Sequence, residues 1–180
     1  MNAAIFVCIC LCVFASCVSA FAPAGRMLAS TLAMLKVGDK APDFELKDAS
    51  GKTFKLPKGK ASVFFFYPAD STPGCTKEAC KFELDGPKFK KAGAEVFGVS
   101  SGGADSKKKF ITANNLSMPL LIDEGDKLRT SWGVPKAAFG LLPGRVTYVI
   151  GKDGVVVQIT DDLANTDKHP AQALAALEKK

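Results

Sequence analysis

The chain has 180 residues, of which 47% are hydrophobic, and its 24 lysines and arginines outnumber 18 acidic residues to give a formal net charge of +6. This length suffices for one domain with a hydrophobic core. The densest basic groups are Lys88, Lys90 and Lys91, and Lys107 to Lys109. They lack an aromatic platform on which bases could stack, so we expect solvated helix faces and no binding of nucleic acid.

The N-terminal residues have the composition of a secretory leader. Residues 1–25 carry no charged side chain, and Ala3 to Ala15 form an unbroken apolar segment. Small residues follow, from Ser16 to Ala20, at the spacing that a signal peptidase reads. We therefore expect a signal peptide over residues 1–20. The apolar segment is too short to span a bilayer as a helix, so we expect no stable membrane anchor.

Residues 21–35 have a second targeting composition. They contain no acidic residue and include alanine, serine, threonine and Arg26, which is typical of a transit peptide. The stretch Ser19 to Pro23 also resembles the bipartite presequence of algae whose plastids arose by secondary endosymbiosis. We expect import into a plastid, with secretion or an endomembrane lumen as the alternative. The remaining residues, 36–180, are predicted to form one domain.

Only two cysteines remain once the expected signal peptide is removed. Four of the six lie within it, where they act as small apolar residues. The other two, Cys75 and Cys80, are too few for a disulfide framework. They are also not a zinc site, because the single histidine, His169, lies far along the chain.

The predicted elements of the domain alternate between strands and helices. Residues 44–46 and 53–56 flank the turn-forming sequence Asp48 to Gly51, which predicts a hairpin. The apolar run that follows indicates a buried central strand over residues 61–67. Later elements are a strand over 95–99, a helix over 104–114, a strand over 119–123, a short helix through Leu128 and Trp132, a hairpin of 145–150 and 155–159, and a closing helix over 170–180. This order predicts an α/β domain with a mixed sheet.

Cys75 lies at the start of a predicted helix. Thr72 suits the N-cap and Pro73 the first helical position, while Gly86-Pro87 breaks the helix at its far end. Free backbone N–H groups and the positive end of the helix dipole meet near Cys75, and both favour a thiolate over a thiol. A strand leading into such a helix is the thioredoxin-like arrangement, although Thr72 stands where a Cys-x-x-Cys motif has its first cysteine.

These residues resemble the active-site signature of a known family. The pattern Pro68-x-x-x-Thr72-x-x-Cys75 matches the peroxiredoxin signature, and with Cys80 it resembles the peroxiredoxin Q (bacterioferritin comigratory protein) subfamily. The likeness covers essentially all of residues 36–180. It continues through Gly93–Ser100, Leu120–Gly125 and Gly140–Val149.

The resemblance implies a thioredoxin-like fold, with a central mixed sheet flanked by helices and an N-terminal hairpin, and a thiol peroxidase that reduces hydrogen peroxide and alkyl hydroperoxides. Cys75 would be the peroxidatic cysteine, and Cys80 the resolving cysteine that forms an intrachain disulfide with it. Thr72 would hold the peroxide, Arg145 would stabilise the thiolate and the departing oxygen, and Pro68 would shield the site. Thioredoxin would be the reductant, no cofactor is needed, and the intrachain disulfide suggests a monomer.

The spacing of the two cysteines makes a further demand on the helix. Five helical residues separate two Cα atoms by roughly 8.6 Å. A disulfide needs a Cα separation below about 6.8 Å. We therefore expect residues 75–80 to unwind on oxidation, with Gly74 and Gly86-Pro87 bounding the segment.

Several assignments keep alternatives at this stage. Cys80 could be a buried structural thiol, Thr72 only an N-cap, and Arg145 a surface residue paired with a carboxylate. His169, just before Pro170 at a helix start, is expected at the surface. The function has two rivals: a thiol–disulfide oxidoreductase, against which the missing Cys-x-x-Cys motif argues, and a redox sensor or holdase that changes partners when the helix opens.

Overall fold

The structure is a computed structural model that describes residues 34–179. The expected signal peptide (residues 1–20) with its four cysteines, and most of the expected transit segment (residues 21–35), lie outside the described residues. Within the described part, no helix is long and apolar enough to cross a membrane.

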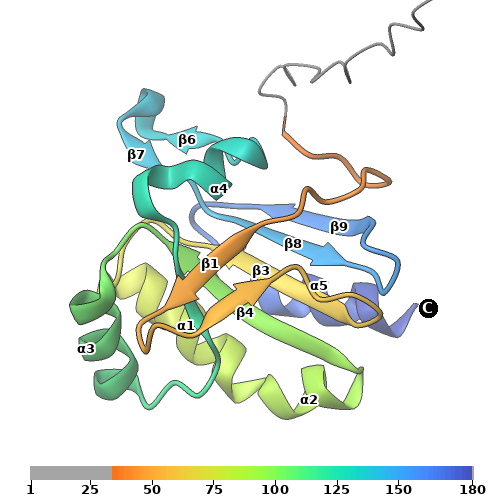
Figure 1. Ribbon diagram of the computed structural model, residues 1–180, viewed down its shortest axis with the longest axis horizontal. Helices are drawn as coiled ribbons and strands as arrows, with labels where there is room; N and C mark the ends of the chain where they lie inside the picture. Colours follow the sequence, from red (N-terminus) through yellow and green to blue (C-terminus); the bar gives the residue numbers. More distant parts are fainter. Residues whose placement is uncertain (1–33, 180) are drawn as a thin grey trace, which may run out of the picture. The chain divides into compact units, whose positions relative to one another are not determined.

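A seven-stranded mixed sheet forms the centre of the fold, in the order β2-β1-β5-β4-β3-β8-β9 (Figure 1). The strands are β1 (Glu45–Asp48), β2 (Thr53–Lys55), β3 (Ala61–Phe66), β4 (Ala94–Ser100), β5 (Leu120–Ile122), β8 (Val146–Ile150) and β9 (Val156–Asp161). Strands β3, β4 and β5 run parallel, whereas β1–β2, β1–β5, β3–β8 and β8–β9 pair antiparallel. The predicted α/β class, mixed sheet and N-terminal hairpin are confirmed.

Five α-helices connect or flank these strands. They are α1 (Pro73–Leu84), α2 (Gly86–Lys91), α3 (Ala104–Asn114), α4 (Lys127–Ser131) and α5 (Lys168–Glu178). The predicted break at Gly86-Pro87 is confirmed, because α1 ends at Leu84 and α2 begins at Gly86. Two 3-10 turns, η1 (Glu124–Asp126) and η2 (Ala138–Gly140), complete the helical elements among the described residues.

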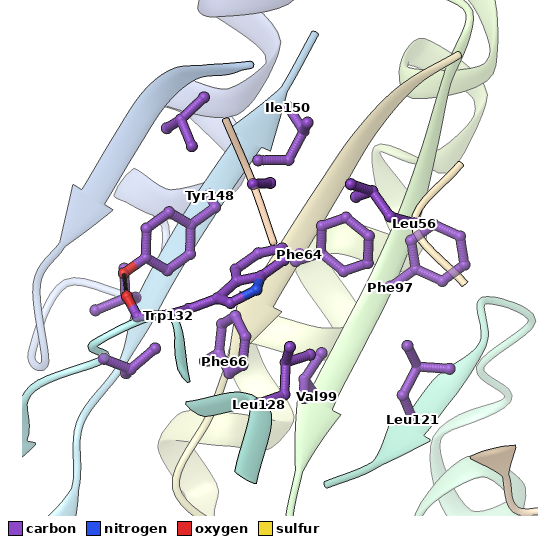
Figure 2. Close-up of a cluster of buried hydrophobic side chains, with 14 residues drawn as sticks. Leu56, Phe64, Phe66, Phe97, Val99, Leu121, Leu128, Trp132, Tyr148 and Ile150 are labelled. Carbon is purple, nitrogen blue, oxygen red and sulfur yellow. Dashed lines mark hydrogen bonds between the residues drawn. The ribbon is translucent and has the colours of Figure 1, made fainter. Parts of the chain in front are cut away.

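Strand β3 is buried on both faces of the sheet, which explains its continuous apolar run. On one face, Phe64 and Phe66 pack with Trp132 and Tyr148, as Figure 2 shows. The Trp132 ring meets the rings of Phe64 and Tyr148 edge-on, with both centroid distances 5.3 Å. On the other face, the core includes residues of α1, α2, α3 and α5, namely Cys75, Ala79, Phe82, Phe89, Phe110 and Ala173. Cys75 therefore lies on the face of the sheet that is covered by helices α1, α2, α3 and α5.

Two features of the fold were not predicted. Strands β6 (Lys136–Ala137) and β7 (Leu142–Pro143) form a separate small sheet. Strands this short give no readable periodicity. Helix α5 begins at Lys168, two residues before the predicted start at Pro170.

The expectation of solvated basic helix faces was wrong for Lys107, whose side chain is fully buried. Lys107 lies three residues before Phe110 and four before Ile111, so it shares the apolar face of α3. Lys108 and Lys109 are exposed, as expected.

Candidate active site

Cys75 is the third residue of α1, with Thr72 as the N-cap and Pro73 at the first position, as predicted. The Thr72 carbonyl oxygen accepts from the Thr76 N–H at 2.8 Å. The N–H groups of Gly74 and Cys75 come too early in the helix to have an intrahelical acceptor. The Thr72 hydroxyl makes no capping hydrogen bond and instead donates to the Ala69 carbonyl oxygen at 3.4 Å. The Cys75 sulfur thus lies at the positive end of the helix dipole.

Arg145 lies beside Cys75 because strands β3 and β8 pair. Phe66, at the end of β3, is opposite Val146, at the start of β8, and Arg145 immediately precedes that strand. Its Nη2 donates to Cys75 Sγ at 3.4 Å, across 70 residues of sequence. Arg145 is 4% exposed and Cys75 is 1% exposed. The alternative that Arg145 is a surface residue is therefore wrong.

The guanidinium of Arg145 is also anchored to a buried carboxyl group. Its Nη1 donates to Glu78 Oε2, and its Nε donates to the Leu163 carbonyl oxygen at 3.2 Å. Glu78 lies three residues after Cys75 on the same helix and is fully buried. Burial raises the pKa of Glu78 to about 8, against the opposing effect of Arg145. A protonated Glu78 carries no negative charge and so does not neutralise Arg145. The positive charge of Arg145 then acts on the Cys75 thiolate.

The expectation that His169 lies at the surface was wrong, because its side chain is fully buried. The earlier start of α5 places His169 in the first turn of that helix, against β8. Its Nε2 lies 2.8 Å from the Asp162 carbonyl oxygen, which only accepts, so Nε2 carries the proton. Its Nδ1 then accepts from the Thr147 hydroxyl at 2.8 Å.

Glu78 Oε1 lies 3.5 Å from His169 Nδ1 and has no hydrogen-bond partner among the described residues. Burial lowers the pKa of His169, and the charge of Arg145 acts in the same direction. A neutral His169 carries no positive charge that would lower the pKa of Glu78. Burial thus favours a neutral Glu78, although its contact with Arg145 acts in the opposite direction, and burial also favours a neutral His169.

Replacement of Glu78 by glutamine is expected to change how stability depends on pH. The raised pKa means that the folded state binds more protons than the unfolded state between pH 4.5 and about 8. The wild-type free energy of unfolding should therefore fall as pH rises through this window, relative to Glu78→Gln. Urea unfolding across the window measures the difference, and parallel curves for the two proteins would contradict the expected protonation of Glu78.

The loop between β3 and α1 holds the other two predicted site residues. Pro68 and Thr72 are both half-buried there, directly before Cys75. The Thr72 hydroxyl donates to the Ala69 carbonyl oxygen and not to Cys75 or Arg145. This bond is long, so the hydroxyl can turn toward a ligand at little cost.

Cys80 faces away from Cys75. It is half-buried on α1, and its Sγ lies 3.8 Å from Asn114 Oδ1 on α3. Both cysteines are free thiols. With α1 intact, their Cα atoms are roughly 8.6 Å apart by helix geometry.

Sequence reasoning missed one buried arginine that frames the site. Arg129, on α4, donates from Nη1 to the Gly144 carbonyl oxygen at 2.7 Å and from Nη2 to the Tyr67 carbonyl oxygen at 2.8 Å. These two residues directly precede Arg145 and Pro68. Arg129 therefore ties together the two chain segments that carry the site. Its place in a short helix without periodicity gave no signal of this role.

Comparison with known proteins gives consistent matches. Residues 37–159 match the model of the AhpC/TSA family. The chain is 48% identical over 165 residues to the chloroplastic peroxiredoxin Q of Triticum aestivum, covering 88% of this chain and 76% of that protein. It resembles the crystal structure of peroxidoxin BcpB from Mycobacterium tuberculosis with a TM-score of 0.74 and 35% identity, over 81% of this chain and 97% of that one.

A further solved structure carries a functional description. The bacterioferritin comigratory protein of Xanthomonas campestris matches with a TM-score of 0.70 and 31% identity, over 82% of this chain and 98% of that one. Its structures were described as trapped intermediate and ligand complexes that bear on the alkyl peroxide reduction activity of that protein.

Proposed function

The chain belongs to the AhpC/TSA family and, within it, to the peroxiredoxin Q group of thiol peroxidases, and on this basis we propose that it reduces hydrogen peroxide and organic hydroperoxides through Cys75. The observation that carries the proposal is the 3.4 Å contact between Arg145 Nη2 and Cys75 Sγ at the start of α1. A buried cation and free backbone N–H groups at one sulfur favour the thiolate, which is the form that attacks a peroxide.

In the proposed reaction the Cys75 thiolate attacks the terminal oxygen of the peroxide. The S–O bond forms as the O–O bond breaks, so the sulfur is oxidised to a sulfenic acid and the departing oxygen leaves as water or an alcohol after gaining a proton. Arg145 stabilises the negative charge as it moves from sulfur to the departing oxygen. The Thr72 hydroxyl holds the peroxide, and Pro68 keeps water from the sulfur.

In the second step Cys80 resolves the sulfenic acid. Its sulfur attacks Cys75 Sγ, which releases water and forms the Cys75–Cys80 disulfide. A dithiol such as thioredoxin then reduces the disulfide through a mixed disulfide and regenerates both thiols. The disulfide lies within one chain, so no second subunit is needed, and we propose a monomer.

Formation of this disulfide is expected to unwind the first half of α1. The far half is anchored by Glu83, which accepts from the Ser117 N–H at 2.8 Å and the Met118 N–H at 3.3 Å. Unwinding should therefore end before Glu83. Amide hydrogen exchange should show protection lost at residues 76–80 on oxidation and kept in β3.

The Cys80→Ser variant is the matched control for this exchange experiment. It forms the sulfenic acid but not the intrachain disulfide, so its α1 should stay protected after peroxide treatment. A wild-type protein that forms the disulfide while residues 76–80 stay protected would show that the helix does not need to open.

A coupled assay separates the proposed function from its two rivals. With thioredoxin, thioredoxin reductase and NADPH present, the protein should cause NADPH consumption only when peroxide is added. Reduction of insulin without peroxide would favour a thiol–disulfide oxidoreductase. Negligible turnover together with oxidation-dependent capture of partner proteins would favour a redox sensor.

We also propose a plastid location. The chloroplastic peroxiredoxin Q of Triticum aestivum supports it, and so does the composition of the N-terminal residues. In this proposal residues 1–20 act as a signal peptide, residues 21–35 as a transit segment and residues 36–180 as the mature domain. A fluorescent protein fused after residue 35 should enter plastids of a secondary-endosymbiotic alga. Retention of the fusion protein in the endomembrane lumen would show that residues 21–35 do not act as a transit segment.

A further inference from the structure

We propose, resting on the function proposed above, that Lys107 is a positioning residue for peroxide reduction. From α3 it holds Asp70, and through Asp70 it fixes the loop of residues 68–72 in the geometry that receives the peroxide. The hydrogen bonds of the Lys107 side chain go to Ser100, Tyr67 and Asp70 and not to Cys75, so it acts through this loop.

Lys107 is a buried cation whose hydrogen-bonding capacity is fully used. Its Nζ donates to Ser100 Oγ at 2.6 Å, to Tyr67 Oη at 3.0 Å and to Asp70 Oδ1 at 3.4 Å. An ammonium group has three donors, and each has a partner here. The Nζ also lies 5.1 Å from the centre of the Tyr67 ring, in cation–π range. A solvated lysine would have none of this arrangement.

Asp70 lies at the centre of the loop of residues 68–72, and several side chains besides Lys107 hold it in place. Its side chain is 1% exposed. Oδ1 also accepts from Tyr67 Oη at 2.7 Å, and Oδ2 accepts from Ser106 Oγ at 2.7 Å. A Cβ at Gly102 would lie 2.0 Å from Oδ2, so only glycine leaves room for the carboxylate at this point. Asp70 is thereby held from the end of β3, from the loop after β4 and from α3.

The loop needs this anchor because its backbone is strained. Ser71, next to Asp70, has a φ of +61°. A left-handed conformation is unfavourable for a non-glycine residue and persists only where its surroundings impose it. Thr72 follows Ser71, and Pro68 lies two residues before Asp70. The position of Asp70 therefore sets the positions of both residues that we assign to the peroxide.

The charges around Lys107 are consistent with this role. Burial lowers the pKa of Lys107 to about 8, against the attraction of Asp70; the charge of Arg129 lowers it further and that of Asp123 raises it. Burial and the Asp70 charge raise the pKa of Tyr67 well above 10, so the phenol stays neutral and donates to Asp70. Although burial opposes it, the pKa of Asp70 is lowered by Lys107 and by its hydrogen bonds.

The test compares two electrophiles that react with the same thiolate. Iodoacetamide needs only the thiolate, whereas peroxide also needs the loop. Lys107→Met should lower the rate constant for peroxide by about ten- to a hundredfold, the loss expected from misplacing a binding group by about an ångström. Its rate with iodoacetamide should stay within about twofold of wild type. Lys108→Met, at an exposed position of the same helix, is the matched control and should change neither rate.

A second variant covers the case in which Lys107→Met does not fold. Asp70→Asn keeps the shape of the side chain and removes its charge, and it should show the same split between the two electrophiles. The pH profile adds an independent readout. Above pH 8 the wild-type peroxide rate should fall relative to its iodoacetamide rate, and this fall should be absent in Lys107→Met.

Three results would overturn the proposal. A wild-type peroxide rate in both Lys107→Met and Asp70→Asn would show that the loop does not depend on this pair. Equal losses with peroxide and iodoacetamide would assign the pair to thiolate stability or to folding instead. A wild-type protein that reacts with iodoacetamide but not with peroxide would overturn the proposed function itself, and this role with it.

Discussion

Replacement of Cys75 by serine is expected to abolish peroxide consumption in the thioredoxin-coupled assay. A serine hydroxyl stays protonated in this site and cannot pass through a sulfenic acid, so both the attack and the covalent intermediate are lost. Because serine is close to cysteine in size and Cys75 is buried, the fold should be kept. The rate of NADPH oxidation after addition of hydrogen peroxide measures the loss directly.

Cys80→Ser is the matched control, since it removes the other thiol of the same helix. This variant should consume one equivalent of peroxide and then stall, or turn over slowly with other thiols. Its stalled form should react with a reagent specific for sulfenic acids. If Cys75→Ser kept catalytic turnover, or if the two variants behaved alike, the assignment of Cys75 as the attacking residue would be wrong.

Replacement of Arg145 by methionine is expected to lower the rate constant for peroxide by about 10²- to 10³-fold. This is the usual cost of removing one donor that stabilises the transition state. Arg145 is buried and in contact with Cys75 Sγ, so little solvent screens its charge. Methionine fills the space of the arginine stem without its charge. Stopped-flow measurement of Cys75 oxidation gives the rate constant.

The Arg145→Lys variant separates charge from geometry. Lysine restores the positive charge but not the planar fork that reaches Cys75, Glu78 and the Leu163 carbonyl oxygen at once. Its rate should lie between those of the wild type and Arg145→Met. A methionine variant that reacts with peroxide at the wild-type rate would show that helix α1 alone activates the sulfur.

The features that sequence patterns predicted well are local ones. The apolar run of β3 and the cap at Thr72 both arise from neighbouring residues, so their positions could be read from the chain. The same holds for the break between α1 and α2. The contact between Cys75 and Arg145 is different, because it depends on the pairing of β3 with β8 across 70 residues. Only the family resemblance pointed to it.

The buried polar residues around the site were the hardest to predict. Lys107 lies in a run of three lysines, which suggests solvent exposure, although its spacing from Phe110 was a readable sign of burial. His169 was misplaced because α5 begins two residues early, which turns the ring toward β8. The contact between Glu78 and Arg145 joins residues 67 positions apart in the sequence. Such groups are buried because tertiary partners satisfy them, and those partners are not visible in a local pattern.

The most direct test is the fraction of Cys75 that is thiolate at neutral pH. The ultraviolet absorbance of the thiolate in the Cys80→Ser variant measures this fraction without interference from the second cysteine of the domain. We expect this fraction to be larger with Arg145 in place than after Arg145→Met in the same background, because the guanidinium lies 3.4 Å from the sulfur. A sulfur that is fully protonated at neutral pH with Arg145 in place would contradict the account.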